Sequence, residues 1–340
     1  MVAPAQTSFN AGELSPLLKG RPTLDKYRNG CETLENFIPQ IQGPARKRPG
    51  TRFVAEVKDS ADATRLLPFE YSTTQAYVLE FGDLYIRFYL DGGVVESSPG
   101  VPYEIVSPYT SAQLAALEYA QSADVIYITH PDHPPYKLAR TSALSWTITA
   151  VTFAWPPFND ENVGTITLTA GAVTGATTLT ASASLFVAAD VGSYFKISEV
   201  SASKYNQWTT GVSHSSGDIV YYLGNIYQSG TTAAAGSRPP IHTTGAESDG
   251  AVTWTFLHDG AGYAQVTGYT SATVVNATVI KRLPATALTG STRWSEGAWS
   301  ARRGYPHAVT FYEDRLWFAG SASKPQTLWA SVSGDYENHK

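Results

Sequence analysis

Short runs of alternating apolar and polar residues, each ended by a turn signal, are the feature that most constrains the fold of this chain. Tyr77, Leu79 and Phe81 alternate along one run, and Asp91-Gly92-Gly93 marks a tight hairpin after the next. Alternation places one set of side chains on one face of a strand. The sequence therefore predicts antiparallel β-structure over most of its length, with one or two short helices.

Changes in composition divide this mainly β chain. We expect propeller-like or sandwich β blades over residues 61–150, and a return to the same style over residues 291–340. Thr-rich strands in residues 151–200 and 263–290 are predicted to pair into one small, discontinuous β-barrel. Residues 201–262 then become a module of three short strands inserted within that barrel.

The N-terminal region, residues 1–60, reads as an arm and a short helix. Leu24, Tyr27, Cys31 and Leu34 recur at steps of three and four, which predicts one apolar stripe on a helix. A second helix is expected within residues 111–121.

A basic run follows the first predicted helix. Arg46, Lys47 and Arg48 lie between Gly43-Pro44 and Pro49-Gly50, so we expect them on a rigid, displayed loop. Such a run is commonly a solvated loop, and a subunit contact is the functional interpretation.

Low charge favours an assembly component or a surface β-protein. Only 16% of the residues are charged, and the formal net charge is −5. This balance argues against binding nucleic acid by neutralising phosphates, which needs clustered Lys and Arg. We see neither a signal-peptide pattern nor about 18 consecutive apolar residues, so we expect no membrane-spanning helix.

No catalytic or metal-binding motif stands out. The single cysteine, Cys31, excludes an intrachain disulfide. His130 and His133 flank Asp132, but the surrounding prolines favour a structural turn over a metal site. Nucleophile-elbow, phosphate-loop and zinc-protease patterns are absent from the sequence. We therefore expect no enzyme activity, no cofactor and no metal.

Aromatic residues dominate the inserted module, and two interpretations of them stay open. They are either the core of a small module or a platform that stacks on sugar rings. We expect Trp208 and Tyr227 to be the exposed rings. The candidate glycan-binding residues are Trp208, Tyr221, Tyr227 and Trp254.

Two blocks resemble the nozzle proteins of short-tailed bacteriophages, also called tail tubular protein B. The N-terminal block includes Asn10 to Pro16, Gly20-Arg21, Gly30-Cys31 and Arg48 to Thr51. The C-terminal block includes Glu296 to Ser300, Arg303 to Pro306, Arg315 to Ser321 and Ser333 to Tyr336. The insert is similar to chitin-binding-type carbohydrate modules.

The resemblance implies a structural protein of the virion tail, made in the host bacterial cytoplasm. Members of this family form a homo-oligomeric ring, usually of six copies, below a portal and an adaptor related to tail tubular protein A. DNA passes through the lumen without specific binding, and fibres or spikes attach outside. The resemblance also implies a chain longer than 340 residues. Candidate assembly contacts are Phe9, Leu14, Arg21, Arg46, Lys47 and Arg48.

Two alternatives to this structural role remain. One is a receptor-binding or adhesion protein that recognises host surface glycans through the aromatic insert. The other is a tail enzyme that cleaves glycans.

Overall fold

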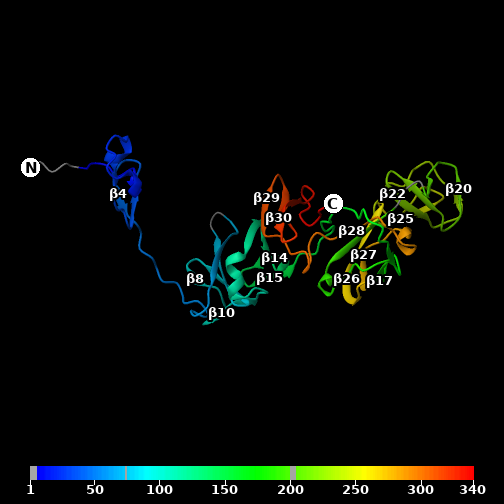
Figure 1. The fold of residues 1–340 in the computed structure, drawn as a ribbon, viewed down its shortest axis with the longest axis horizontal. Coiled ribbons are helices and arrows are strands. Elements are labelled where there is room, and N and C mark those ends of the chain that lie inside the picture. Colours follow the sequence, from blue (N-terminus) through cyan, green and yellow to red (C-terminus); the bar gives the residue numbers. More distant parts are fainter. Residues whose placement is uncertain (1–5, 73–74, 200–203) are drawn as a thin grey trace, which may run out of the picture. The chain divides into compact units, whose positions relative to one another are not determined.

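The computed structural model describes residues 6–72, 75–199 and 204–340, and these residues form an all-β protein (Figure 1). The predicted fold class is therefore confirmed. The chain divides into two compact units, Met1–Ala55 and Glu56–Lys340. Every helix in the described ranges is a short 3-10 turn. The first five residues of the predicted arm lie outside the described residues, as does the start of the predicted insert.

The N-terminal unit consists of two small pairs of strands and two helical turns. Parallel β1 and β2 pair Gly12 with Gly30, and antiparallel β3 and β4 pair Ile38 with Arg46. Its elements are β1 (Gly12–Glu13), η1 (Pro16–Leu18), η2 (Asp25–Asn29), β2 (Gly30–Cys31), β3 (Phe37–Pro39) and β4 (Ala45–Lys47).

The predicted helix across Leu24 to Leu34 is wrong in type and extent. Only the 3-10 turn η2 forms, and the chain is already extended at Gly30. A Cβ on Gly30 would lie 2.5 Å from Leu14 Cγ, so glycine permits the close approach of β1 and β2. A pairing distant in sequence thus overrides the local helical spacing.

The basic run was predicted as a loop, and most of it is a strand. Arg46 and Lys47 belong to β4, which returns along β3. Gly43, with a φ of +113°, lies in the turn between these two strands. The Gly43-Pro44 pair is therefore the turn of a hairpin.

Three antiparallel sheets of the second unit pack face to face. The first sheet has β5 (Arg65–Glu70), β6 (Ala76–Gly82), β7 (Tyr85–Leu90), β8 (Gly93–Val94) and β11 (Glu104–Val106), beside the pair β9 (Glu96–Ser98) and β10 (Val101–Pro102). The second sheet has β12 (Glu118–Ser122), β13 (Val125–His130), β14 (His133–Ser142) and β15 (Ser145–Ala150). The third sheet has β29 (Ala308–Tyr312), β30 (Arg315–Ser321) and β31 (Lys324–Ala330).

Strand β13 explains this stacking. Its side chains alternate: Ile126 and Ile128 enter the core shared with the first sheet, whereas Tyr127 enters the core shared with the third. Because both faces of β13 are covered, the run from Val125 to Ile128 is apolar without alternation. The second sheet therefore lies between the other two, and its strands β12 and β13 contact β29 although they are distant from it in sequence.

The second predicted helix, within residues 111–121, is only partly helical. The 3-10 turn η3 (Ser111–Ala116) ends before β12, which pairs with β13 from Glu118 onward. Strand pairing again limits a helical pattern.

The Thr-rich segments form one partly curled, six-stranded sheet, here called the half-barrel. Its order is β16-β17-β27-β26-β18-β28, so the expected pairing between the two segments is observed. Leu168 and Ser291 exchange two backbone hydrogen bonds of 2.8 and 3.0 Å. Its elements are β16 (Leu168–Ala170), β17 (Gly175–Ala181), η4 (Ala188–Asp190), β18 (Tyr194–Ser198), β26 (Ala261–Ser271), β27 (Val274–Lys281), η6 (Ala285–Leu288) and β28 (Trp294–Glu296).

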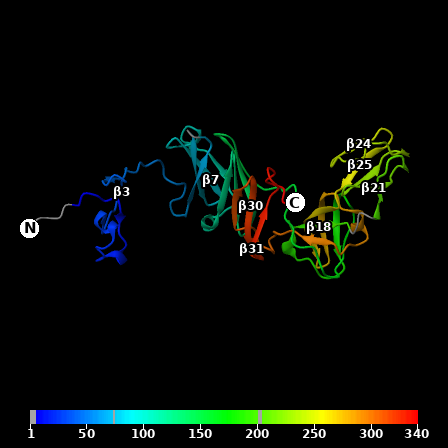
Figure 2. The same ribbon diagram turned by 90° about the horizontal axis from the view of Figure 1, so that it is seen from above.

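The insert leaves the half-barrel after β18 and returns at β26, where Ser198 and Ala261 are cross-strand partners. It has more strands than the three predicted, because edge strands of two or three residues leave no alternation to read (Figure 2). Its strands are β19 (Asn206–Gln207), β20 (Ser213–His214), β21 (Ile219–Tyr222), β22 (Asn225–Ser229), β23 (Ala233–Ala234), β24 (Ala246–Ser248) and β25 (Thr253–His258).

Candidate functional sites

The N-terminal unit has no hydrophobic core within its described residues, 6–55. From residue 6 to residue 55, the only buried residues are glycines: Gly12, Gly30 and Gly43. Large apolar side chains are exposed instead, and Ile41 is 92% exposed. The others are Leu17, Leu24, Phe37, Ile38, Phe53 and Val54. Folding must repay the ordering of the backbone by burying apolar surface, and the described residues of this unit bury little of it.

The predicted assembly residues all lie in this unit but do not form one cluster of contacts. Phe9 and Leu14 are half-buried, and Arg21 is exposed. The Phe9 N–H donates to Gly43 O at 2.6 Å, and the Leu14 N–H donates to Cys31 O at 3.0 Å. Phe9 and Leu14 thus help to hold the unit together. No interaction in the described residues tests their role in assembly.

The basic residues face solvent from the β3–β4 hairpin and its end. Arg46 and Lys47 are exposed on β4. Arg48 donates from Nε to Asn36 Oδ1 at 2.6 Å, which fixes its side chain beside the hairpin. Basic and apolar side chains therefore share one small surface.

Charge is divided unevenly along the chain. Residues 1–55 hold eight Lys and Arg against four Asp and Glu, a net charge of +4. Residues 56–340 hold 16 Lys and Arg against 25 Asp and Glu, a net charge of −9. The two units therefore have opposite signs, which the overall value of −5 conceals.

The aromatic residues of the insert form its core rather than a platform. Trp208 is 8% exposed and Tyr227 is fully buried, so the prediction that these two rings are exposed is wrong. Trp254 is also buried, and Tyr221 is half-buried. A module this small needs its largest rings inside to exclude water.

Asp249 anchors that core. It accepts from Trp254 Nε1 at 2.9 Å and from the backbone N–H groups of Gly236 and Val252. Burial by itself would raise the pKa of Asp249, but these hydrogen bonds stabilise the carboxylate and lower the pKa. Asp249 is therefore a structural group with its acceptor sites already in use.

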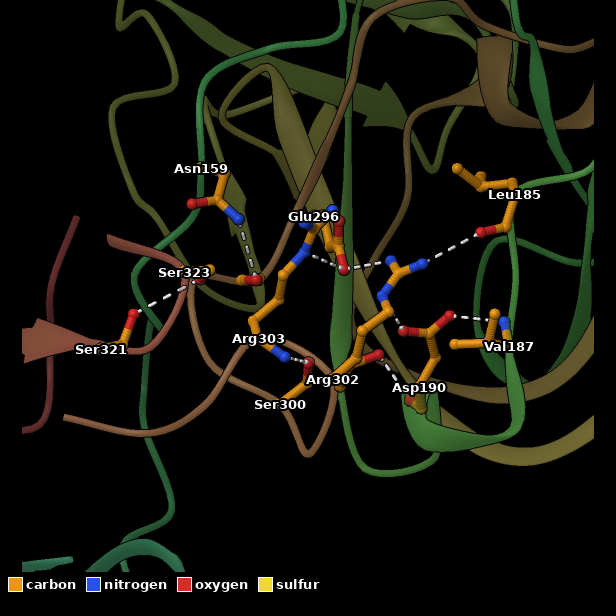
Figure 3. Close-up of polar contacts among 12 residues, drawn as sticks. Asn159, Leu185, Val187, Asp190, Glu296, Ser300, Arg302, Arg303, Ser321 and Ser323 are labelled. Carbon is orange, nitrogen blue, oxygen red and sulfur yellow. Dashed lines mark hydrogen bonds and ion pairs between the residues drawn. The ribbon is translucent and has the colours of Figure 1, made fainter. Parts of the chain in front are cut away.

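The C-terminal block contains a buried charged cluster, shown in Figure 3. The Glu296 carboxylate lies between two guanidinium groups: it pairs with Arg302 and, at 2.6 Å, with Arg303. Arg302 Nε also lies 2.9 Å from Asp190 Oδ1. Asp190 is fully buried, and this burial raises its pKa. Two buried carboxylates are thus compensated by two arginines, as buried charges require.

This cluster joins two parts of the fold. Glu296 ends β28 of the half-barrel and pairs with Phe195 on β18, whereas Arg302 and Arg303 begin the segment that leads to the third sheet. The Asn159 N–H also donates to Glu296 O at 2.8 Å. Sequence reasoning missed this role, because Asp190 and Arg302 are far apart in the chain and nothing in their spacing connects them.

His130 and His133 lie on either side of a turn between β13 and β14. The Asp132 N–H donates to His130 Nδ1 at 3.1 Å, and His133 Nε2 lies 3.1 Å from Gln113 Oε1. Burial lowers the pKa of both imidazoles. Within the described ranges, no group of three or more His, Cys, Asp or Glu could hold a metal ion.

The same ranges contain no helix that is both long and apolar enough to cross a bilayer. Comparison with models of known protein families, and with curated proteins, found no match.

Proposed function

We propose that this protein is a structural subunit of a short-tailed phage tail. Copies of the chain, six if it follows the family it resembles, enclose the nozzle through which DNA leaves. The ring docks to an adaptor on one side and to fibres or spikes outside. The protein is made in the host cytoplasm and resides in the virion tail.

The single observation that carries this proposal is the coreless N-terminal unit. It contains the block with the more specific resemblance, and it exposes apolar side chains such as Ile41 and Phe53. A segment of this kind is stabilised by contacts with other molecules, as in an assembled ring. An isolated monomer would leave that surface in water.

The charge distribution supports passage of DNA without binding. The larger unit, with a net charge of −9, repels phosphates, and a conduit wall needs no sequence-reading contacts. The chain then acts by its shape and by association rather than by turning over a substrate.

Glycan recognition by the insert is the less favoured function. Stacking on a sugar needs an exposed ring face, yet Trp208, Tyr227 and Trp254 are buried. Tyr221 is the one half-buried ring among the four candidates.

The test is to find the protein in its particle and to image it alone. Antibody against the purified chain should label the tails of virions of the encoding phage, and negative-stain images of the purified protein should show rings. If the protein is absent from virions and remains a monomer at high concentration, the proposal is wrong.

A further inference from the structure

We propose that the N-terminal unit of one copy docks on the outer face of the third sheet of a second copy, through its β3–β4 hairpin. This inference rests on the proposed assembly and names the contact that builds it. The hairpin is the donor surface, defined by Phe37, Ile38, Ile41, Arg46 and Lys47. The acceptor surface is defined by Ala308, Thr310, Tyr312, Trp317, Ala319 and Leu328.

The donor surface cannot bury itself. Phe37 and Ile38 are adjacent on β3 and therefore point to opposite faces of the hairpin, yet both are about half exposed. Ile41, in the turn, is 92% exposed. A two-stranded hairpin with apolar residues on both faces is at best marginally stable in water. It needs a second apolar surface to cover it.

The acceptor surface is the open side of an otherwise packed sheet. On the inner face of the third sheet, Val309, Leu316 and Phe318 are buried against the second sheet. The outer face is also apolar, with Leu328 65% and Tyr312 63% exposed. The six residues named above, with Val309, line a recess of about 340 Å³. A sheet normally exposes polar side chains on a solvated face, so this face indicates a partner.

Charge favours this pairing over the alternatives. The donor unit has a net charge of +4 and the acceptor unit one of −9. Glu313, in the turn between β29 and β30, is exposed at the end of the acceptor face. Two donor surfaces facing each other would instead bring like charges together, which costs free energy. Complementary charge also steers the encounter of the two surfaces.

Two different surfaces of one chain that fit each other make a heterologous contact. Each copy then donates one surface and accepts with the other, and repetition of that contact generates a ring if the rotation closes. This arrangement places a second copy, rather than a different protein, on the acceptor face.

The first experiment tests association of the full-length chain. Ile41→Asp on the donor and Leu328→Asp on the acceptor change exposed side chains, so each variant should fold normally. Each should weaken self-association at least about tenfold in sedimentation or mass photometry, since a charge is placed in an apolar contact. The matched control is Leu223→Asp, at an exposed position of the insert, which should associate like the wild type.

Mixing gives the sharper result. The Ile41→Asp variant keeps an intact acceptor, and the Leu328→Asp variant keeps an intact donor. The mixture should therefore form heterodimers although neither variant self-associates. If the mixture remains monomeric while the wild type assembles, the donor–acceptor contact is wrong.

Cross-linking separates contacts between chains from contacts within one chain. Cys31→Ser removes the only cysteine. In that background, Ile41→Cys and Leu328→Cys proteins, made separately and mixed, should form an interchain disulfide. If a double-cysteine chain forms only a monomeric loop, the occupant is the same copy and the inference fails. If the Ile41→Asp and Leu328→Asp variants still form multimers like the wild type, this contact is wrong but the proposed assembly stands. If the wild-type protein never associates, the proposed assembly is wrong.

Discussion

The two blocks that stand out in the sequence have opposite structural roles. The first part of the C-terminal block is buried: Glu296 sits in a four-residue charged cluster, and Trp299 is packed among aromatic rings. The N-terminal block has no buried side chain larger than glycine in its described residues. Conspicuous motifs therefore need not mark binding surfaces. The C-terminal block joins parts of the scaffold and also presents Trp317 and Ala319 on the outer face of a sheet, whereas the N-terminal block leaves its large apolar side chains exposed.

The largest expected effect comes from removing an aromatic ring in each block. Trp299 packs on Phe318, Trp329 and Phe153 with centroid distances of 5.1 to 5.5 Å. Trp299→Ala should lower the free energy of unfolding by about 4 kcal/mol, because it leaves a cavity. Phe53→Ala, at an exposed N-terminal position, should change it by less than about 0.5 kcal/mol. Urea unfolding of both variants checks this contrast, and equal losses would contradict it.

Protonation of histidine should act on the larger unit alone, since residues 1–55 contain no histidine. Burial lowers the pKa of both His258 and His339 to about 4. The unfolded state takes up these protons near pH 6.5, whereas the folded state resists them until about pH 4. The free energy of unfolding that each neutral histidine contributes is therefore fully present above pH 6.5. It is lost as the pH falls from 6.5 to about 4, by about 3 kcal/mol per histidine.

The check is denaturant unfolding at pH 7.5 and pH 4.5. His339→Leu should remove less than half of the acid sensitivity, leaving the shares of His258, His130 and His133. A variant that loses stability with acid as steeply as the wild type would show that His339 is not responsible.

A smaller effect is expected when one charge of the buried cluster is neutralised. Glu296→Gln removes the carboxylate that Arg302 and Arg303 share and leaves Arg302 paired with Asp190, and we expect a loss of about 2 kcal/mol, since Arg303 is partly exposed. Glu35→Gln, on the exposed N-terminal block, is the matched control and should be neutral. Thermal unfolding of the two variants compares them directly.

The smallest expected effect is the protection of the backbone amides of the N-terminal unit against hydrogen exchange in the dilute monomer. With no buried side chains, its amides in residues 6–55 should exchange rapidly with solvent, whereas those of β13 or β22 should exchange slowly. Protection of residues 6–55 should rise as the protein concentration increases. Slow exchange in a strictly monomeric sample would show that the unit is stable by itself.

The sequence was sufficient to predict the β-strands and their turns, but not the places where a helical pattern does not form a helix. The hairpin at Glu313-Asp314 was predictable from turn chemistry, and both residues adopt a positive φ, of 48° and 56°. The helical spacing at Leu24 to Leu34 was misleading, because the pairing of Gly30 with Gly12 depends on a contact that periodicity does not encode.

The candidate sites were less predictable than the fold. The rings of Trp208 and Tyr227 are apolar in any environment, so composition cannot say which side of a small sheet they occupy. Ile41 and Phe53 gave a weak signal: apolar residues near a basic run in a segment without strand or helix periodicity. The pairing of Arg302 with both Asp190 and Glu296 depends on how the half-barrel curls, which no local sequence pattern predicts.

The pairing of Ser198 with Ala261 has a practical consequence. The chain leaves the half-barrel at the end of β18 and returns at the start of β26, so the two ends of the insert lie next to each other on paired strands. A different domain with adjacent termini could be spliced in at this junction without altering the register of β18 and β26. This junction is therefore a site at which one inserted domain can be replaced by another, either in evolution or by protein engineering.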